Sequence, residues 1–268
     1  MKSVTVLIVN YKAADLVLQN LPNLTAERQG VERLDIVLVE NASPDDSFQA
    51  LQKGVAELGW EDRVELIRSP VNGGFAAGNN LGLRAIYARA EQPDGVLLLN
   101  PDTDFFPGAL RALCEAAEAY PEAGGLGGRA LNEELKPRGC CYRYPSFANE
   151  ISRVPGVFHL MPEHLRETEM LVDAREPGPC DWVSGSCFLI KRAALEDVPF
   201  FDEGYFLYYE ETDFCRRMND AGWKIYHVPA ARFVHVGGQS TGIKAQRAKV
   251  GDLPLYWYDS WRRYHMKN

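Results

Sequence analysis

Short apolar runs alternate with amphipathic segments through the first half of the chain. Apolar strands separated by helices of about 10–15 residues are typical of a parallel sheet covered on both faces. The expected strands are residues 4–9, 35–40, 63–68 and 95–100. The helices expected to follow them are residues 13–21, 46–58, 75–90 and 107–119. The pattern therefore predicts an α/β fold with a Rossmann-like, mostly parallel central sheet.

The second half is less regular, and residues 137–180 are rich in Pro, Arg and Gly. The expected elements here are a short helix at 161–170, a buried strand within 180–192, a helix within 203–223 that ends at Gly222, and two short strands within 224–236. Gly is common just beyond a helix C-terminus because it adopts a left-handed backbone without cost. This half is expected to be a smaller mixed region beside the main sheet.

Composition narrows the class of protein. The 268 residues suffice for one large α/β domain, and 46% of them are hydrophobic. A net charge of −8 without a basic run excludes a nucleic-acid partner. The N-terminus does not have the pattern of a signal peptide, and no apolar run reaches the roughly 20 residues that span a bilayer. These features predict a cytoplasmic protein.

The six cysteines form no C-x-x-C pair, and no group of His residues lies near them in the sequence. Structural zinc sites usually use such closely spaced ligands. We therefore expect free thiols and no structural zinc.

Polar and glycine residues follow each of the four expected strands. They are Asn10 and Tyr11, Glu40, the loop 70–79, and the pair Asp102 and Asp104. Ligands bind at the carboxyl ends of parallel strands, so these residues should share one crevice.

Asp102 and Asp104 are separated by one residue, so in an extended segment both carboxylates point the same way. Such a pair suits Mg²⁺ or Mn²⁺ and leaves coordination positions for phosphate oxygens. The alternative is that Asp-Thr-Asp caps the helix beginning near Pro107. His235, between a short strand and two glycines, is a candidate third metal ligand or a structural His.

Two loops offer further binding groups. Residues 71–80 read VNGGFAAGNN, where glycines and a helix N-terminus favour close approach to an anion. The alternative is that these glycines only form a tight turn before the helix. Glu40 can accept from a base N–H or a ribose hydroxyl, while Ser43 or Asp45 can cap the following helix.

The stretch YYEETDFCRR (208–217) opens a helix with three acids. Glu210 and Asp213 share one face of this helix and Glu211 points elsewhere. Asp213 can form a surface ion pair with Arg217. The neighbouring aromatic residues indicate partial burial, which would raise a carboxylate pKa toward the range useful to a general base.

Together these stretches resemble the family 2 glycosyltransferases of the GT-A fold, most closely the rhamnosyltransferase-like branch. The motifs that carry the resemblance span residues 4–241 and are, in order, VLIVNYK, VENASPDDS, NGGFAAGNN, LLLNPDTD, WVSGSCFLIKR, GYFLYYEETDFCRRMNDAGW and HVGGQST. The resemblance implies one GT-A domain over residues 1–268. Its expected parts are a nucleotide-sugar half at about 1–130, an acceptor and catalytic half at about 131–241, and a helical tail at about 242–268.

The resemblance also implies roles for individual residues. Asp104 would hold the metal, Asp102 the ribose or a metal-bound water, and His235 would complete the metal site. Glu211 would be the catalytic base, with Glu210 as the alternative and Asp213 beside them. The nucleotide-binding set would be Asn10, Tyr11, Glu40, Asn72, Gly74, Asn79 and Asp102. Trp182 and Gly185 would lie near the donor sugar or the acceptor. The family usually has Asp at the positions of Glu40 and Glu211.

The implied reaction is metal-dependent sugar transfer from a nucleotide diphosphate to an acceptor hydroxyl, with inversion. The branch suggests dTDP-L-rhamnose as donor, with UDP- and GDP-sugars open, and a saccharide or lipid-linked glycan as acceptor. A degenerate domain that only binds carbohydrate or a partner is the alternative. The aromatic and basic tail is either a peripheral membrane contact or a packed terminal helix.

Overall fold

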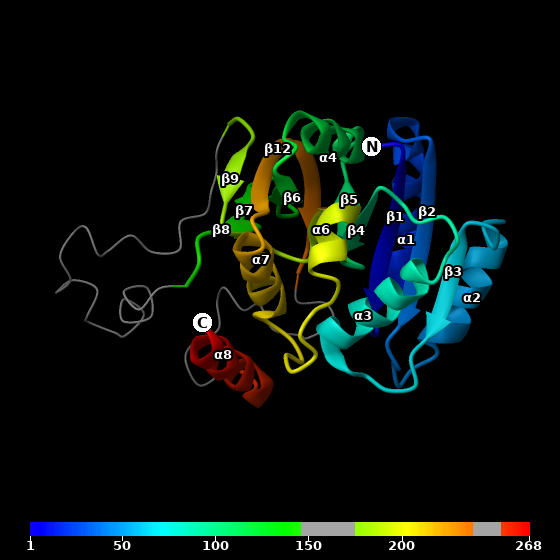
Figure 1. Ribbon diagram of the computed structural model, residues 1–268. Coiled ribbons are helices and arrows are strands. Elements are labelled where there is room, and N and C mark those ends of the chain that lie inside the picture. Colours follow the sequence, from blue (N-terminus) through cyan, green and yellow to red (C-terminus); the bar gives the residue numbers. More distant parts are fainter. Residues whose placement is uncertain (146–174, 238–252) are drawn as a thin grey trace, which may run out of the picture.

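The computed structural model describes residues 1–145, 175–237 and 253–268 (Figure 1). The helix expected at 161–170 lies outside these residues. Within them, one sheet of ten strands runs through the molecule, with the main order β3-β2-β1-β4-β11-β6-β12-β5.

The N-terminal part of the sheet is the parallel sheet that the sequence predicts. Its strands are β1 (Ser3–Asn10), β2 (Arg33–Glu40), β3 (Val64–Arg68) and β4 (Gly95–Leu99). β1 pairs in parallel with both β2 and β4, and β2 pairs in parallel with β3. Every residue of β1 after Ser3 is buried, as expected for a central strand covered on both faces.

The other part of the sheet is mixed. It contains β5 (Thr103–Phe105), β6 (Ala123–Leu131), β11 (Cys187–Lys191) and β12 (Lys224–His235), with β7 (Pro137–Arg138) and β9 (Gly178–Cys180) at its edges. β11 runs antiparallel to both β4 and β6 and so joins the two parts into one sheet. β8 (Cys141–Tyr142) and β10 (Trp182–Val183) form a separate antiparallel pair.

Some details differ from the sequence-based expectations, which did not include the strand β5. Residues 224–235 form one strand, β12, rather than two, with an irregular register between His227 and Arg232. A separate strand, β6, was not expected because its sequence AGGLGGRAL is rich in glycine. Its glycines have a packing reason: a Cβ on Gly128 would overlap the carbonyl oxygen of Ala231 on β12.

The helices in the first half occur where the sequence predicts them. They are α1 (Ala14–Ala26), α2 (Ser47–Glu57), α3 (Gly74–Tyr87) and α4 (Ala109–Ala119), with a 3-10 turn, η1 (Glu27–Gly30), after α1. α3 packs on β1 and β2, and α4 packs on β6 and β12. The second half contains α6 (Arg192–Asp197), α7 (Glu210–Asp220) and α8 (Leu255–Lys267).

The C-terminal helix α8 lies beside the segment that precedes α7 (Figure 1). Tyr209 packs against Trp257 and Tyr264 of α8, with ring centroids 5.9 and 5.3 Å apart. α7 itself ends as the sequence predicts, since Gly222 follows its C-cap with a φ of +95°. Among the described residues, every helix is too short or too polar to cross a bilayer.

Candidate active site

The candidate site is built where the carboxyl end of β4 meets the loop before β11. Because β11 is antiparallel to β4, Cys187 pairs with Leu99, and the preceding loop lies beside Asn100. The carbonyl oxygen of Ser186 accepts the backbone N–H of Asn100 at 3.3 Å and the hydroxyl of Thr103 at 3.0 Å. The segment carrying Asp102 is therefore fixed to the loop carrying Gly185.

Asp102 and His235 lie together at this end of the sheet. His235 pairs with Thr103 across β12 and β5, which places its Nε2 3.3 Å from Asp102 Oδ1. The backbone N–H of Gly237 donates to Asp102 Oδ2 at 2.7 Å. Burial, which leaves Asp102 8% exposed, favours the neutral acid, but the hydrogen bonds from His235 and Gly237 outweigh it and lower the pKa of Asp102. The carboxylate is thus held ionised beside an imidazole.

Asp104 faces a different neighbour. Its Oδ1 accepts the amide of Asn23 on α1 at 2.9 Å. Within the part of the chain that the structure describes, the oxygens of Asp102 and Asp104 and a ring nitrogen of His235 do not all lie within 4.8 Å of one another. The structure thus brings Asp102 and His235 into contact, with Asp104 turned toward α1.

Helix capping does not explain the two aspartates. The backbone N–H groups of Gly108 and Leu110, at the start of α4, donate to Glu27 at 2.8 and 2.9 Å. The two oxygens of the Glu27 carboxylate therefore cap this helix, and the capping interpretation of Asp102 and Asp104 is wrong.

The residues expected to bind the nucleotide line the ends of β1 and β2. Asn10 is fully buried and its Oδ1 accepts the N–H of Ala13 at 3.2 Å, which shapes the turn that presents Tyr11. Glu40 is also buried, and its Oε1 accepts the N–H of Ser43 at 2.7 Å. Of the expected caps, Asp45 bonds to the first N–H of α2, whereas Ser43 accepts the N–H of Lys12.

The glycine loop is held by its neighbours within the protein. The N–H of Gly74 donates to Asn72 Oδ1 at 3.0 Å, and the N–H of Phe75 donates to the carbonyl oxygen of Phe206 at 2.9 Å. The Asn79 side chain donates to the Phe75 carbonyl at 2.8 Å. The amides of Gly74 and Phe75 are therefore engaged within the protein, and the loop joins α3 to the segment before α7.

The two glutamates at the start of α7 lie in different surroundings. Glu210 is 1% exposed, and its Oε2 has no hydrogen-bond partner among the described residues. Glu211 is partly exposed, and its Oε1 accepts the N–H of Gly185 at 3.2 Å. Burial raises the pKa of both carboxyl groups, and for Glu210 the nearby charge of Glu211 adds to the effect.

The backbone directly before Glu210 and Glu211 is strained. Tyr208 and Tyr209 both have left-handed backbone angles, with φ of 72° and 67°. Such conformations are uncommon for residues with side chains and persist only where packing holds them. The contacts between Tyr209 and α8 supply that packing.

Asp213 forms the ion pair with Arg217 that the sequence suggested, but the pair is buried on the Asp213 side rather than lying on the surface. Asp213 is 0% exposed, and its carboxylate binds Arg217 Nε at 3.0 Å and Lys267 Nζ of α8 at 2.7 Å. The hydroxyl of Tyr205 also donates to it at 3.3 Å. These contacts make Asp213 a buried link between α7 and the C-terminal helix.

Gly185 lies beside Glu211, and a Cβ on it would meet the Phe75 ring at 2.6 Å. Trp182 stacks on Tyr142 and donates from its Nε1 to the Arg143 carbonyl. Phe75, Ser186, Asn23 and Lys267 are site contacts that sequence reasoning missed. Phe75 stands within the glycine motif and Ser186 within the WVSGSCFLIKR motif, but Asn23 and Lys267 had no local signal.

Comparison with known proteins shows the family of the chain. The family described as Glycosyl transferase family 2 matches residues 5–198, and the chain belongs to that family. It is 32% identical over 222 residues to the N-acetylglucosaminyl-diphospho-decaprenol L-rhamnosyltransferase of Mycobacterium tuberculosis. The aligned region covers 78% of this chain and 68% of that relative. The chain is thus a glycosyltransferase of family 2 with rhamnosyltransferase relatives.

Solved structures show that the fold is GT-A, as the resemblance implied. The mannosyltransferase from Pyrobaculum calidifontis in complex with GDP-Man and Mn²⁺ superposes with a TM-score of 0.58 at 18% identity, over 88% of this chain and 57% of that one. GalNAc-T7 with UDP, GalNAc and Mn²⁺ gives 0.61 at 15% identity, over 88% of this chain and 44% of that one. The chain spans about half the length of these two structures.

Proposed function

We propose that this chain is an inverting, metal-dependent glycosyltransferase that moves L-rhamnose from dTDP-L-rhamnose to a hydroxyl of a saccharide or lipid-linked glycan. The observation that carries the proposal is the hydrogen bond between Glu211 and the N–H of Gly185. The next residue, Ser186, accepts a hydrogen bond from Thr103, the neighbour of Asp102. A base thus lies close to the acidic segment. The rhamnosyltransferase relative supports the sugar and the acceptor class.

Glu211 is the better candidate for the base, and Glu210 is the weaker one. A base must touch the acceptor hydroxyl, and Glu211 is partly exposed while Glu210 is almost fully buried. The raised pKa of Glu211 brings it nearer to that of an effective base at neutral pH. In the proposed step Glu211 takes the proton of the hydroxyl, the freed oxygen bonds to the anomeric carbon, and the bond from that carbon to the diphosphate breaks.

Asp102 and His235 would hold the metal, Mg²⁺ or Mn²⁺, and Asp104 would have to turn away from Asn23 to join them. Adjacent ligands on an ion with bonds of about 2.1 Å lie about 3 Å apart, and Asp102 Oδ1 lies 3.3 Å from His235 Nε2, so this pair fits one ion. An ion bound there would neutralise the negative charge that the diphosphate gains on leaving. The Mn²⁺ in the two similar structures supports a divalent ion here.

The remaining residues would position the donor. Asn10, Tyr11, Glu40, Asn72 and Asn79 surround the ends of β1, β2 and the start of α3, where a nucleotide binds in such sheets. The tail would add a peripheral contact at the inner face of the membrane, since α8 leaves Leu255 83% and Met266 82% exposed. On this proposal the enzyme is cytoplasmic.

A calorimetric panel of dTDP, UDP and GDP, each with and without Mn²⁺, tests the donor and the metal together. We expect metal-dependent binding of dTDP. Preference for UDP or GDP would replace the proposed donor but keep the reaction class. Binding of none of the three, with or without metal, would indicate a degenerate domain that binds only carbohydrate or a partner.

Replacement of Glu211 by Gln tests the base. The amide cannot take the proton, so kcat should fall about 10²–10⁴-fold. Nucleotide affinity, measured by the same calorimetry, should stay within a factor of about two, because Glu211 contacts Gly185 and not the nucleotide-binding residues. Near-normal turnover by Glu211→Gln would refute this assignment.

A further inference from the structure

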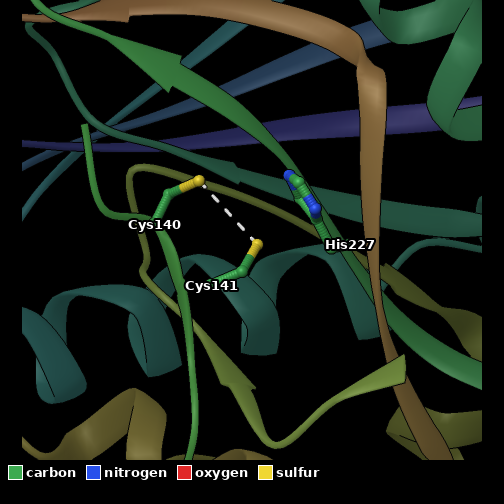
Figure 2. A group of neighbouring side chains, drawn as sticks. All are labelled: Cys140, Cys141 and His227. Carbon is green, nitrogen blue, oxygen red and sulfur yellow. Dashed lines mark hydrogen bonds between the residues drawn. The ribbon is translucent and has the colours of Figure 1, made fainter. Parts of the chain in front are cut away.

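Figure 2 shows a group of sulfur and imidazole side chains that the proposed reaction does not use: Cys140, Cys141 and His227. Cys141 is the first residue of β8 and Cys140 precedes it, and His227 lies on β12. One ligand atom from each residue falls within 4.8 Å of the other two, and the three residues are at most 6% exposed. Residues that are 86 positions apart in the sequence thus converge on one point.

A fourth sulfur is adjacent. The thiol of Cys180, on β9, lies within hydrogen-bonding reach of Cys141. β9 pairs antiparallel with β12, with Cys180 opposite Ile225 and Gly178 opposite His227. Cys180 and His227 therefore project from the same face of the sheet, because directly opposed residues share a face and side chains alternate along each strand. The Cys180 sulfur does not lie within 4.8 Å of all three of the other ligand atoms, so its side chain would have to rotate to complete the set.

The spacing suits a tetrahedral thiolate site. Zn–S bonds of about 2.3 Å at tetrahedral angles place two sulfurs about 3.8 Å apart. The Cys140 and Cys141 sulfurs are 3.8 Å apart. Three cysteines and one histidine form one of the usual ligand sets of structural zinc, and soft thiolate ligands select against Mg²⁺ and Mn²⁺.

We propose that Cys140, Cys141, Cys180 and His227 bind one Zn²⁺ ion as a structural site, distinct from the metal site of the proposed reaction. The ion would tie β8 and β9 to β12. β8 pairs with β10, and β10 leads directly into the loop of Ser184–Ser186. The zinc would therefore stabilise the strand pair from which the Gly185 loop begins, and this proposal does not depend on the identity of the sugar or nucleotide.

Titration of the reduced protein with Co²⁺ tests the site, because Co²⁺ replaces Zn²⁺ and reports its ligands optically. We expect one equivalent of Co²⁺ with a thiolate-to-metal charge-transfer band and the visible spectrum of tetrahedral coordination. Zn²⁺ should abolish both, whereas excess Mn²⁺ should not. Co²⁺ bound at Asp102 and His235 would give no thiolate band, so the two sites are distinguishable.

Matched variants identify the ligands. Cys141→Ser and His227→Asn should each lose the tetrahedral spectrum. Cys114→Ser should keep it, because Cys114 is equally buried but lies on α4, outside the cluster. The Co²⁺ spectrum of the unaltered protein tests the proposed zinc site even if a cluster variant fails to fold. Absence of the thiolate band in the folded protein, or an equal band in denaturant, would overturn the proposal.

Discussion

At the residue scale, Glu210 presents a buried carboxyl group with an unsatisfied oxygen. Burial, together with the charge of Glu211, raises its pKa well above the ordinary 4.5, so the folded state holds this proton more tightly than the unfolded state. Its contribution to stability is then greatest in acid and declines as the pH rises from the ordinary value through the raised one. The residue should destabilise the protein at alkaline pH.

We therefore predict that Glu210→Gln raises the free energy of unfolding by about 1–3 kcal/mol at pH 8, because it removes the cost of ionising a buried group. The gain should shrink as the pH falls toward the ordinary value of 4.5, because the unfolded carboxyl then takes up its proton as well. Urea unfolding at both pH values measures the difference, with exposed Glu61→Gln as control. A gain that does not change with pH would contradict this account.

Gly74 offers a second test at this scale, because it combines a φ of +84° with close approach of the Phe206 carbonyl. Gly222 has a φ of +95° but no atom within 4 Å of a Cβ built on it. Gly222→Ala should cost about 1–2 kcal/mol from backbone strain alone. Gly74→Ala should cost at least about 1 kcal/mol more, because overpacking adds to the strain. Equal thermal shifts for the two variants would show that the Phe206 contact carries no energy.

At the element scale, ion pairs anchor α8 to the segment before α7. Asp202 accepts Arg263 Nη2 at 2.8 Å and Lys267 Nζ at 3.1 Å. Partial burial opposes ionisation, but the Gly204 amide and the two cations lower the pKa of Asp202 to about 2. A depressed pKa stabilises the fold above the ordinary value of 3.8, and this stabilisation is lost as the pH falls toward 2.

We predict that Asp202→Asn increases hydrogen exchange across α8 and lowers stability by about 1 kcal/mol at pH 7. The difference from the unaltered protein should disappear near pH 2, where Asp202 itself becomes protonated. Asp259→Asn, an exposed position on the same helix, is the control and should leave exchange unchanged. Equal exchange in all three proteins would show that these ion pairs do not hold α8.

At the scale of the whole molecule, the C-terminal helix α8 supports the segment that carries Glu210 and Glu211. α8 packs on Tyr209, and its Lys267 pairs with the buried Asp213 of α7. The residues proposed to bind the nucleotide come instead from the β1, β2 and α3 region. Sugar transfer and nucleotide binding should therefore respond differently to loss of this helix.

Removal of residues 253–268 should lower kcat about 10²-fold, because the left-handed Tyr208 and Tyr209 would relax and Glu211 would shift. dTDP affinity, measured by calorimetry with Mn²⁺, should change by less than a factor of about three. Retained near-UV circular dichroism is the control for folding. Parallel loss of turnover and affinity would show instead that α8 supports the whole site.

The sequence by itself determined the parallel half of the sheet, its helices and the acids at the strand ends. Those features depend on local hydrophobic period and on residues next to one another, and β1, β4 and α3 follow from them directly. The sequence did not predict the strand β6, because its glycines have low strand propensity. Those glycines allow β6 to pack closely against β12.

Only the tertiary structure decided which polar groups meet. Capping of α4 by Glu27, burial of Asp213 under Lys267 and the contact of Glu211 with Gly185 all join residues far apart in the sequence. The same holds for His227 beside Cys140 and Cys141, where spacing along the chain argued against a zinc site. Long-range pairing of β12 with β6 and β9 creates that cluster, and no local pattern encodes it.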